Sequence, residues 1–199
     1  MNNVNYDKLM IEQLDRLGTK PSLLLHACCA PCSTAVIERL REYFEITVYF
    51  YNPNIQPIDE YLRRESEMRR LLTMPGYEGI RYVAGEYDED TFVTTTEHMS
   101  EDREGGRRCE VCHDLRLTST AKVAREGGYD FFTTTLSVSP HKNATLINRL
   151  GEKLSREYGV EWLYSDFKKR GGYQRSVSLS NALGLYRQSY CGCLYTRDR

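Results

Sequence analysis

The chain has 199 residues, 40% of them hydrophobic and 28% charged, and its formal net charge is −1. This is the composition of an ordinary soluble protein, and the length is sufficient for a full hydrophobic core. The N-terminal residues lack the order of a signal peptide, and no apolar run approaches the roughly 20 residues of a membrane-spanning helix. We therefore expect a cytoplasmic protein without a membrane partner, in a compartment that keeps thiols reduced.

Charge is distributed unevenly along the chain. From residue 168 onward seven basic residues accompany one acid, so this segment carries +6 and residues 1–167 carry −7. No change in composition separates two globular units. We expect one α/β domain over residues 1–199, with residues 168–199 as a helical, basic C-terminal extension. Such a surface either attracts a phosphate backbone or is simply solvated.

Five short β-rich runs are predicted strands, at 22–25, 46–51, 80–84, 130–135 and 160–164. Between them, apolar residues at helical spacing predict four helices. Glycines at 127, 128 and 159, and the Pro75-Gly76 pair, provide the stop signals. The acidic stretch 87–106 shows no regular pattern, and we expect it to be a mobile loop. The helical faces are Val36, Leu40 and Phe44; Tyr61, Met68 and Leu72; Leu117, Ala121 and Ala124; and Ile147, Leu150, Leu154 and Tyr158.

Strands that alternate with amphipathic helices predict right-handed crossovers and a doubly wound, mainly parallel α/β sheet. In such a sheet ligands bind beyond the carboxyl ends of the strands. The polar and thiol side chains of this chain gather at those positions. Cys28, Cys29 and Cys32 follow the first strand, Asn52 and Asn54 the second, Cys109 and Cys112 the third at an expected helix start, and Ser137, Ser139, His141 and Asn143 the fourth.

The seven cysteines fall into three groups, 28-29-32, 109-112 and 191-193. In a reducing compartment this grouping favours metal binding or redox catalysis over a disulfide framework. One tetrahedral zinc ion would leave three thiols over, and the position of the thiols at the ligand edge of a sheet favours an iron-sulfur cluster over zinc. The sequence Cys29-Ala-Pro-Cys32 is also typical of a thioredoxin-type motif, but the additional thiol of Cys28 argues against that interpretation.

Three further features each have two interpretations. A disulfide across the single residue between Cys191 and Cys193 would be strained and easily reduced, so the pair is either a two-electron store or two structural ligands. His26 on an apolar strand is either a core histidine or a proton donor. His141 precedes a helix among hydroxyl and amide groups that suit a ribose or a base edge, although Ser and Asn there also cap helices.

Assembled, these segments closely resemble the QueH family of epoxyqueuosine reductases, which complete queuosine synthesis on tRNA without cobalamin. The resemblance runs almost end to end and implies a Rossmann-like fold of the adenine-nucleotide-hydrolase type. The matching segments are Leu25-His-Ala-Cys-Cys-Ala-Pro-Cys32, Tyr51-Asn-Pro-Asn-Ile55 with Glu60-Tyr61, Cys109-x-x-Cys112, Thr134-Thr-Leu-Ser137 with Ser139-Pro140 and Lys142-Asn143, and Tyr186-Arg-Gln-x-Tyr-Cys-Gly-Cys193.

The resemblance also implies roles for the cysteines. Cys28, Cys29, Cys109 and Cys112 would hold a 4Fe-4S cluster, and Cys191 with Cys193 would form a redox-active pair. Cys32, with or without Cys193, would bind an adjacent mononuclear iron at the reacting centre.

The implied reaction removes the epoxide oxygen of epoxyqueuosine at the wobble position of a tRNA with a GUN anticodon. It consumes two electrons, from a low-potential electron donor, and two protons, for which His26 and Tyr190 are candidate sources. The expected contacts with the tRNA are Asn52, Asn54, Ser137, His141, Lys168, Lys169, Arg170, Arg175 and Arg187.

Two other functions stay open at this point. A thioredoxin-like thiol-disulfide oxidoreductase would use Cys29 and Cys32. A non-catalytic zinc protein that binds RNA would use the thiols as structural ligands.

Overall fold

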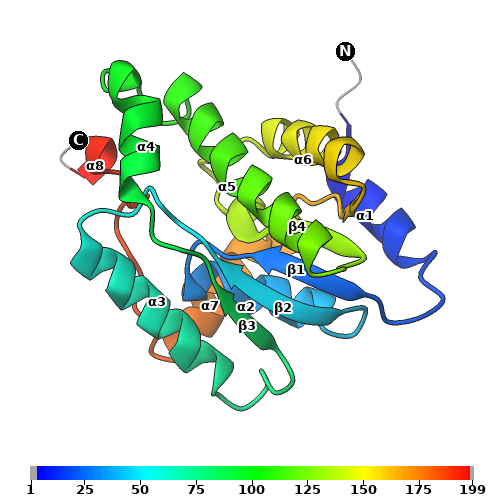
Figure 1. The fold of residues 1–199 in the computed structure, drawn as a ribbon. Helices are drawn as coiled ribbons and strands as arrows, with labels where there is room; N and C mark the ends of the chain where they lie inside the picture. The colour runs from blue at the N-terminus through cyan, green and yellow to red at the C-terminus, as the bar shows by residue number, and fades with distance from the viewer. Residues whose placement is uncertain (1–3, 198–199) are drawn as a thin grey trace.

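A computed structural model describes residues 4–197 and contains a five-stranded parallel sheet with the strand order β3-β2-β1-β4-β5 (Figure 1). The predicted doubly wound α/β architecture is therefore confirmed, and each strand lies within two residues of its predicted bounds, except that β5 is shorter. The strands are β1 (Ser22–His26), β2 (Glu45–Phe50), β3 (Arg81–Ala84), β4 (Phe131–Thr134) and β5 (Glu161–Trp162).

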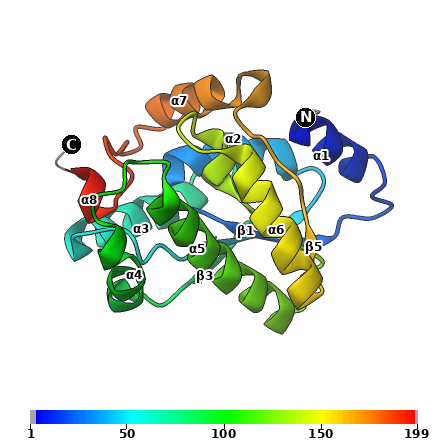
Figure 2. The ribbon, with the colours of Figure 1, turned by 90° about the horizontal axis from the view of Figure 1, so that it is seen from above.

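Helices cover both faces of the sheet (Figure 2). On β1, Leu23 and Leu25 pack with the α2 and α3 face, and Leu24 between them packs with the α5 and α6 face. This alternation is what a strand buried on both sides requires. None of the helices within residues 4–197 is long and apolar enough to cross a membrane. The helices are α1 (Tyr6–Leu14), α2 (Ala30–Leu40), α3 (Ile58–Leu72), α4 (Glu89–Thr96), α5 (Arg107–Glu126), α6 (Ala144–Tyr158), α7 (Gly172–Ala182) and α8 (Leu194–Arg197), with short 3₁₀ turns η1 (Glu97–Met99), η2 (Thr135–Val138) and η3 (Lys169–Gly171).

The stretch 87–106 is not the irregular loop that the sequence predicted. It contains α4, whose N-terminus is capped by the Asp88 carboxylate accepting from the Thr91 N–H at 3.0 Å. Phe92 is fully buried against Cys112 and Cys193. One aromatic anchor therefore holds a helix whose acidic and threonine-rich sequence has no amphipathic stripe. The Cys109 and Cys112 pair does lie at a helix start, as predicted, in the first two turns of α5.

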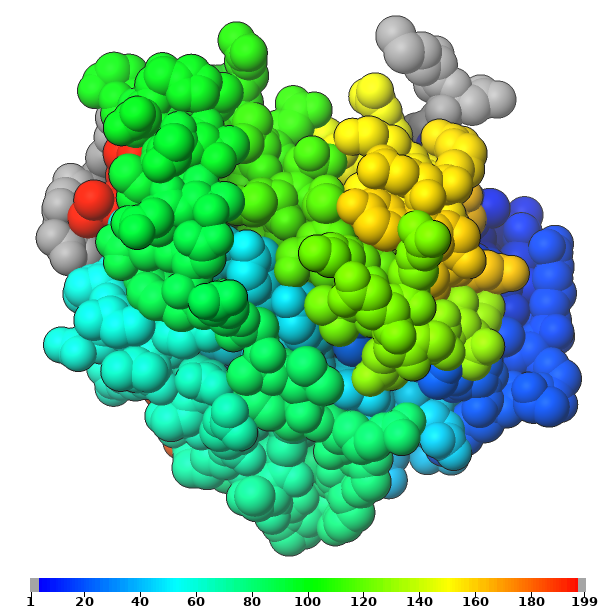
Figure 3. All heavy atoms as spheres, viewed as in Figure 1, coloured from blue at the N-terminus to red at the C-terminus, as the bar shows by residue number. Residues whose placement is uncertain are grey.

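The topology brings the segments that follow β1 and β4 to one edge of the sheet. β1 and β4 are neighbours, but the chain leaves β1 toward α2 on one face and leaves β4 toward α6 on the other. Ligand crevices open at such a switch point. From α7 the chain returns across α3 and ends at α8, which Figure 3 shows in red beside the green segment that contains α4.

Gly151 on α6 provides a test of the packing between this helix and the sheet. A Cβ at this position would lie 2.2 Å from the Trp162 ring. We expect Gly151→Ala to lower the free energy of unfolding by about 1–3 kcal/mol, because overpacking outweighs the roughly 1 kcal/mol gained in helix propensity. Chemical denaturation measures the change. The control is Gly18→Ala, because no atom lies within 4 Å of its added methyl. Equal stability of the two variants would show that Gly151 does not pack closely against Trp162.

Candidate metal and redox site

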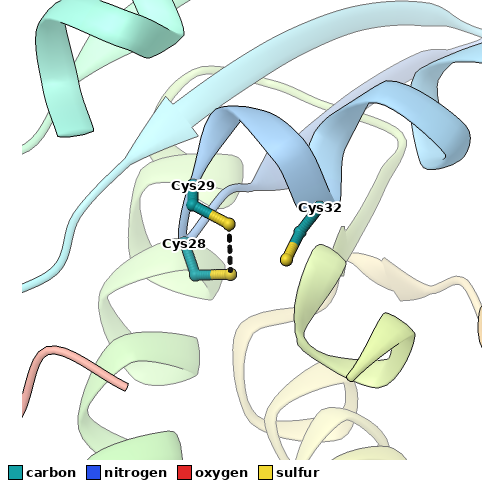
Figure 4. A group of neighbouring side chains, drawn as sticks. All are labelled: Cys28, Cys29 and Cys32. Carbon is teal, nitrogen blue, oxygen red and sulfur yellow. Dashed lines mark hydrogen bonds between the residues drawn. The ribbon is translucent and has the colours of Figure 1, made fainter. Parts of the chain in front are cut away.

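Three cysteine sulfurs converge where β1 passes into α2. Cys28 and Cys29 directly follow the strand, and Cys32 lies in the first turn of the helix, which begins with Ala30 and Pro31. The sulfurs of Cys28, Cys29 and Cys32 all lie within 4.8 Å of one another, and those of Cys28 and Cys29 are 3.8 Å apart (Figure 4). We call these three residues the thiol triad.

The triad favours one thiolate shared by two thiols. Hydrogen bonds from Cys29 and Cys32 hold the pKa of Cys28 well below that of an ordinary thiol. The same contacts raise the pKa of Cys29 to about 12 and that of Cys32 well above its ordinary value. In a thioredoxin-type pair the first cysteine of the motif has the lowered pKa. Here Cys29 has the opposite shift, because Cys28 takes the anionic role.

The geometry of the triad fits a thiolate-bound metal. Two sulfurs on one tetrahedral ion, each at about 2.3 Å from the metal, lie roughly 3.8 Å apart, which is the Cys28 to Cys29 separation. Cys109 and Cys112, the other two thiols of the expected cluster set, are not members of this compact group. Among residues 4–197 the triad is the one group of three or more thiol, imidazole or carboxylate side chains with this spacing.

The other four cysteines form a second assembly beside the first. Cys112 and Cys193 pack together against Phe92. Burial, with a smaller contribution from the nearby Cys191, raises the pKa of Cys112 to about 12 and that of Cys193 to about 11. Burial also raises the pKa of Cys109, although its sulfur accepts from the Gly105 N–H at 3.2 Å. All seven cysteines are free thiols in this structure.

The segment 186–193, which we call the strap, is held on α3 by Arg64. This side chain is 2% exposed. Its Nε donates to Glu60 at 2.7 Å, and its Nη1 and Nη2 donate to the carbonyls of Cys191 and Tyr190 at 3.0 and 3.3 Å. Because a buried guanidinium needs its acceptors, the strap backbone is fixed where these carbonyls meet it.

The turn 55–57 holds the strap from a second side. The Gln56 N–H donates to the Gly192 carbonyl at 2.8 Å, and the Tyr190 hydroxyl donates to the Gln56 carbonyl at 2.8 Å. Gly192 has a φ of +110°, and a Cβ there would lie 2.8 Å from Ile55 Cγ1 and 3.0 Å from Arg64 Nη1. Only glycine combines this backbone conformation with this approach.

A polar network lies beneath the thiol triad. His26 is fully buried, with Nδ1 2.7 Å from the Thr134 hydroxyl and Nε2 3.1 Å from the Tyr51 carbonyl. Burial lowers its pKa to about 3, so the ring is neutral. Arg116, 1% exposed, donates to Asn52 at 2.6 Å and approaches His26 Nε2 at 3.4 Å. The structure thus places His26 within the core, beside Arg116, with both ring nitrogens in hydrogen-bond contact with Thr134 and Tyr51.

A pocket of about 290 Å³ opens above the triad and reaches the strap. Cys28, Cys32 and Cys191 line it, so the two cysteine assemblies share one cavity. Three of the cations on its wall have no carboxylate partner among the described residues: Arg116, Lys142 and Arg187. Burial acts to lower the pKa of Lys142, but the sulfurs of Cys191, Cys28 and Cys32 outweigh it and raise the pKa. The remaining lining residues are Arg64, Glu104, Leu136, Ser139, Pro140, His141, Tyr173, Gln188, Ser189 and Tyr190.

The expected substrate contacts divide into two sets. His141 and Arg187 line the pocket. Asn52, Asn54 and Ser137 are buried and do not line it; the Ser137 hydroxyl lies 3.1 Å from that of Ser165.

The basic extension is also divided. Lys168 pairs with Asp166 at 2.7 Å, Arg170 with Asp7 at 2.8 Å and Arg175 with Glu38 at 2.5 Å, all away from the thiols. Lys169 lies beside Arg170, outside the pocket. The Arg197 side chain, Asp198 and Arg199 lie outside the described residues.

The sequence reading missed Arg64, Arg116 and Lys142. Glu60 four residues before Arg64 predicts an ion pair on α3, but nothing in the sequence indicates that the pair is buried. Lys142 stands in one of the matched segments, without a role until the fold places it against the thiols.

Comparisons with known proteins agree on one family. The family model described as "Epoxyqueuosine reductase QueH" matches residues 23–199. Proteins named epoxyqueuosine reductase QueH from Staphylococcus epidermidis and Streptococcus pyogenes are 42% and 40% identical to the chain, over 96% of its length in each case and over 84% and 78% of theirs. The protein of that name from Thermotoga maritima is 38% identical over 88% of this chain and 90% of its own length.

The thiol triad predicts an unusual alkylation profile for the metal-free protein. Because Cys28 has a lowered pKa, its reaction with iodoacetamide is expected to stay fast as the pH falls below the range of ordinary thiols. Cys29→Ala removes one hydrogen-bond donor to the Cys28 thiolate, so the pKa of Cys28 should rise. The rate at which Cys28 reacts with iodoacetamide at pH 7 should then fall by about threefold or more. Peptide mass spectrometry over a pH series measures the rate. Cys109→Ala is the control, and identical profiles for the two variants would contradict the shared thiolate.

The strap contacts predict a specific effect of Gly192→Ala. The added methyl must push the strap away from Ile55 and Arg64, so we expect trypsin to cleave after Arg187 about tenfold faster, since local opening exposes the bond. Gly184→Ala shares a left-handed backbone, with a φ of +57°, but has no atom within 4 Å of the new methyl. Equal cleavage of the two variants would show that the strap is not held at Gly192.

Proposed function

The chain belongs to the epoxyqueuosine reductase QueH family of oxidoreductases, and we propose that it reduces epoxyqueuosine to queuosine at the wobble position of a GUN-anticodon tRNA. The observation that supports this most directly is the pocket that brings Cys28, Cys32 and Cys191 to one cavity, at the switch point of the sheet. A substrate group bound in this pocket would contact the thiols of Cys28, Cys32 and Cys191. It would also meet cations that have no carboxylate partner among the described residues. This arrangement favours a reductase over either a zinc-only RNA-binding protein or a two-cysteine oxidoreductase.

The reaction balances with two electrons and two protons. The two C–O bonds of the epoxide break, a C=C bond forms between the same carbons, and the oxygen leaves as water. In this proposal Cys191 and Cys193 supply two electrons as a dithiol and become a disulfide that a low-potential donor reduces again. Cys191 lines the pocket with Cys28 and Cys32, and Cys193 packs with Cys112, which supports an electron path between the second cysteine assembly and the pocket.

The proposed cofactors are a 4Fe-4S cluster on Cys28, Cys29, Cys109 and Cys112, and an adjacent iron with Cys32 among its ligands. When bound, these groups would supply single electrons at low potential and a Lewis acid for the epoxide oxygen. The convergence of the triad sulfurs supports metal binding at Cys28, Cys29 and Cys32. Joining Cys109 and Cys112 to Cys28 and Cys29 in one ligand set requires the first turns of α5 and the triad to approach each other around the cluster.

The pocket wall provides the proposed contacts with the nucleotide. The Tyr173 and Tyr190 rings and His141 offer stacking surfaces or hydrogen bonds to a base splayed out of the anticodon loop. Arg187 is oriented toward the pocket by its bond to the Ser180 hydroxyl at 2.8 Å. Lys168, Lys169, Arg170 and Arg175 would contact phosphates farther along the tRNA. The carboxylate partners of Lys168, Arg170 and Arg175 would compete with those phosphates.

The test is turnover of tRNA that carries epoxyqueuosine by protein purified without oxygen and supplied with a low-potential chemical reductant. Nucleoside mass spectrometry follows the loss of one oxygen, and iron and acid-labile sulfide are measured on the same sample. We expect turnover with bound iron, and Cys28→Ala should abolish both. A protein that contains stoichiometric zinc and no iron, and that leaves the epoxide intact, would contradict the proposal.

Cys191→Ser tests the redox pair separately. We expect turnover to fall at least tenfold at saturating reductant, an increase of about 1.4 kcal/mol in the barrier, with the iron content unchanged. Ser189→Ala, also on the pocket side of the strap, is the matched control. Full turnover by Cys191→Ser would exclude the pair from the deoxygenation step.

A further inference from the structure

The wall of the thiol pocket carries more cations than carboxylates, and in the metal-free protein the Cys28 thiolate offsets only one of them. Arg64 is neutralised by Glu60 at 2.7 Å. Arg116, Lys142 and Arg187 have no such partner among the described residues, and Glu104 is the one carboxylate on the wall. Buried or half-buried cations are rarely left without an anion. The pocket is therefore built to receive negative charge.

Two of these cations have other tasks that already fix their side chains. Arg116 is buried and donates to Asn52 in the network beneath the triad. Arg187 donates to the Ser180 hydroxyl and, at 3.4 Å, to the Ser176 carbonyl. Lys142 has no hydrogen bond from its ammonium to another described residue, and it is half-buried on the wall. Its three N–H donors are available to a ligand.

The backbone around Lys142 is held by hydrogen bonds, so the point from which this side chain enters the pocket is defined. The Lys142 N–H donates to the Ser139 carbonyl at 3.2 Å, and the next residue, Asn143, caps α6 by accepting from Thr145 and Leu146 at 3.0 and 3.2 Å. The turn that follows β4 therefore presents its lysine at the switch point of the sheet. An ammonium with three free donors can turn to bind an oxyanion at this wall.

We propose that Lys142 binds a backbone phosphate of the nucleotide that enters the pocket, and so fixes that nucleotide against the thiols. This rests on the proposed function for the identity of the RNA. A cavity of about 290 Å³ is near the lower limit of about 300 Å³ for ligand pockets, so the bound part of the RNA is small and its phosphates would lie toward the wall. A phosphodiester carries one negative charge. It would neutralise the Lys142 ammonium, which has no carboxylate partner among the described residues.

The test measures RNA binding by the metal-loaded protein, without turnover. A fluorescent anticodon stem-loop RNA without the modification is titrated at several salt concentrations, for the wild-type chain, Lys142→Gln and Lys142→Arg. We expect Lys142→Gln to weaken binding about tenfold and to reduce the slope of log K against log salt by about 0.7, the value for one phosphate contact on a single strand. Lys142→Arg should restore the slope, since it keeps the charge.

Lys153→Gln is the matched control, because Lys153 is an exposed α6 lysine that pairs with Asp114 at 3.7 Å, outside the pocket. Its slope should equal that of the wild type. An unchanged slope for Lys142→Gln, at any iron content, would overturn the proposal, and so would equal losses for both lysine variants. Inorganic phosphate separates the sources: if it binds the wild-type protein but not Lys142→Gln, while Lys142→Gln leaves RNA binding unchanged, the site takes free phosphate and the proposal for RNA is wrong. Wild-type protein that binds this RNA but does not turn over the modified tRNA would refute the proposed function alone.

Discussion

The guanidinium of Arg64 is the contact on which the arrangement of the cysteines depends. It joins one carboxylate of α3 to two strap carbonyls, and each of its three nitrogens has an acceptor. Removing one partner of a buried pair typically costs about 3–5 kcal/mol, because a charge is left without compensation. That penalty keeps the strap in place although few of its side chains are apolar. The position of Cys191 at the pocket therefore depends on the Arg64 guanidinium, which belongs to α3 and not to the strap.

The sequence predicted the scaffold and the thiol triad because both depend on local spacing. Short continuous runs of apolar and β-branched residues define β1 and β2. Cys29 and Cys32 are three residues apart at the start of a helix, which places them on one face. The proximity of Cys193 to Cys112 depends on Phe92, whose helix has no periodic pattern. Arg64, Arg116 and Lys142 were missed for a related reason. A charged residue in an isolated sequence is expected at the surface, and only tertiary packing shows that these three are buried or half-buried around the thiols.

The electrostatics of the site are arranged in layers. Arg116, Lys142 and Arg187 line the same pocket as Cys28 and Cys32, and Arg116 also donates to Asn52 in the buried polar network. Without metal, the hydrogen bonds of the triad favour a single thiolate on Cys28. A metal would replace the shared protons and fix more of the sulfurs as anions, and the surrounding cations offset that added charge. Cations offset in this way would bind a simple anion from solvent less tightly. A ligand that makes additional contacts with the protein would therefore be favoured over such an anion.

The pairing of Cys28 and Cys32 with Cys191 has a consequence for how the molecule matures. The triad comes early in the chain, while the strap follows every strand of the sheet. During synthesis the first three thiols therefore emerge long before the segment that covers them. A nascent chain exposes these sulfurs to the cell's metal carriers and oxidants until α3 captures the strap. Closure over the thiols therefore waits until the strap carbonyls can reach Arg64.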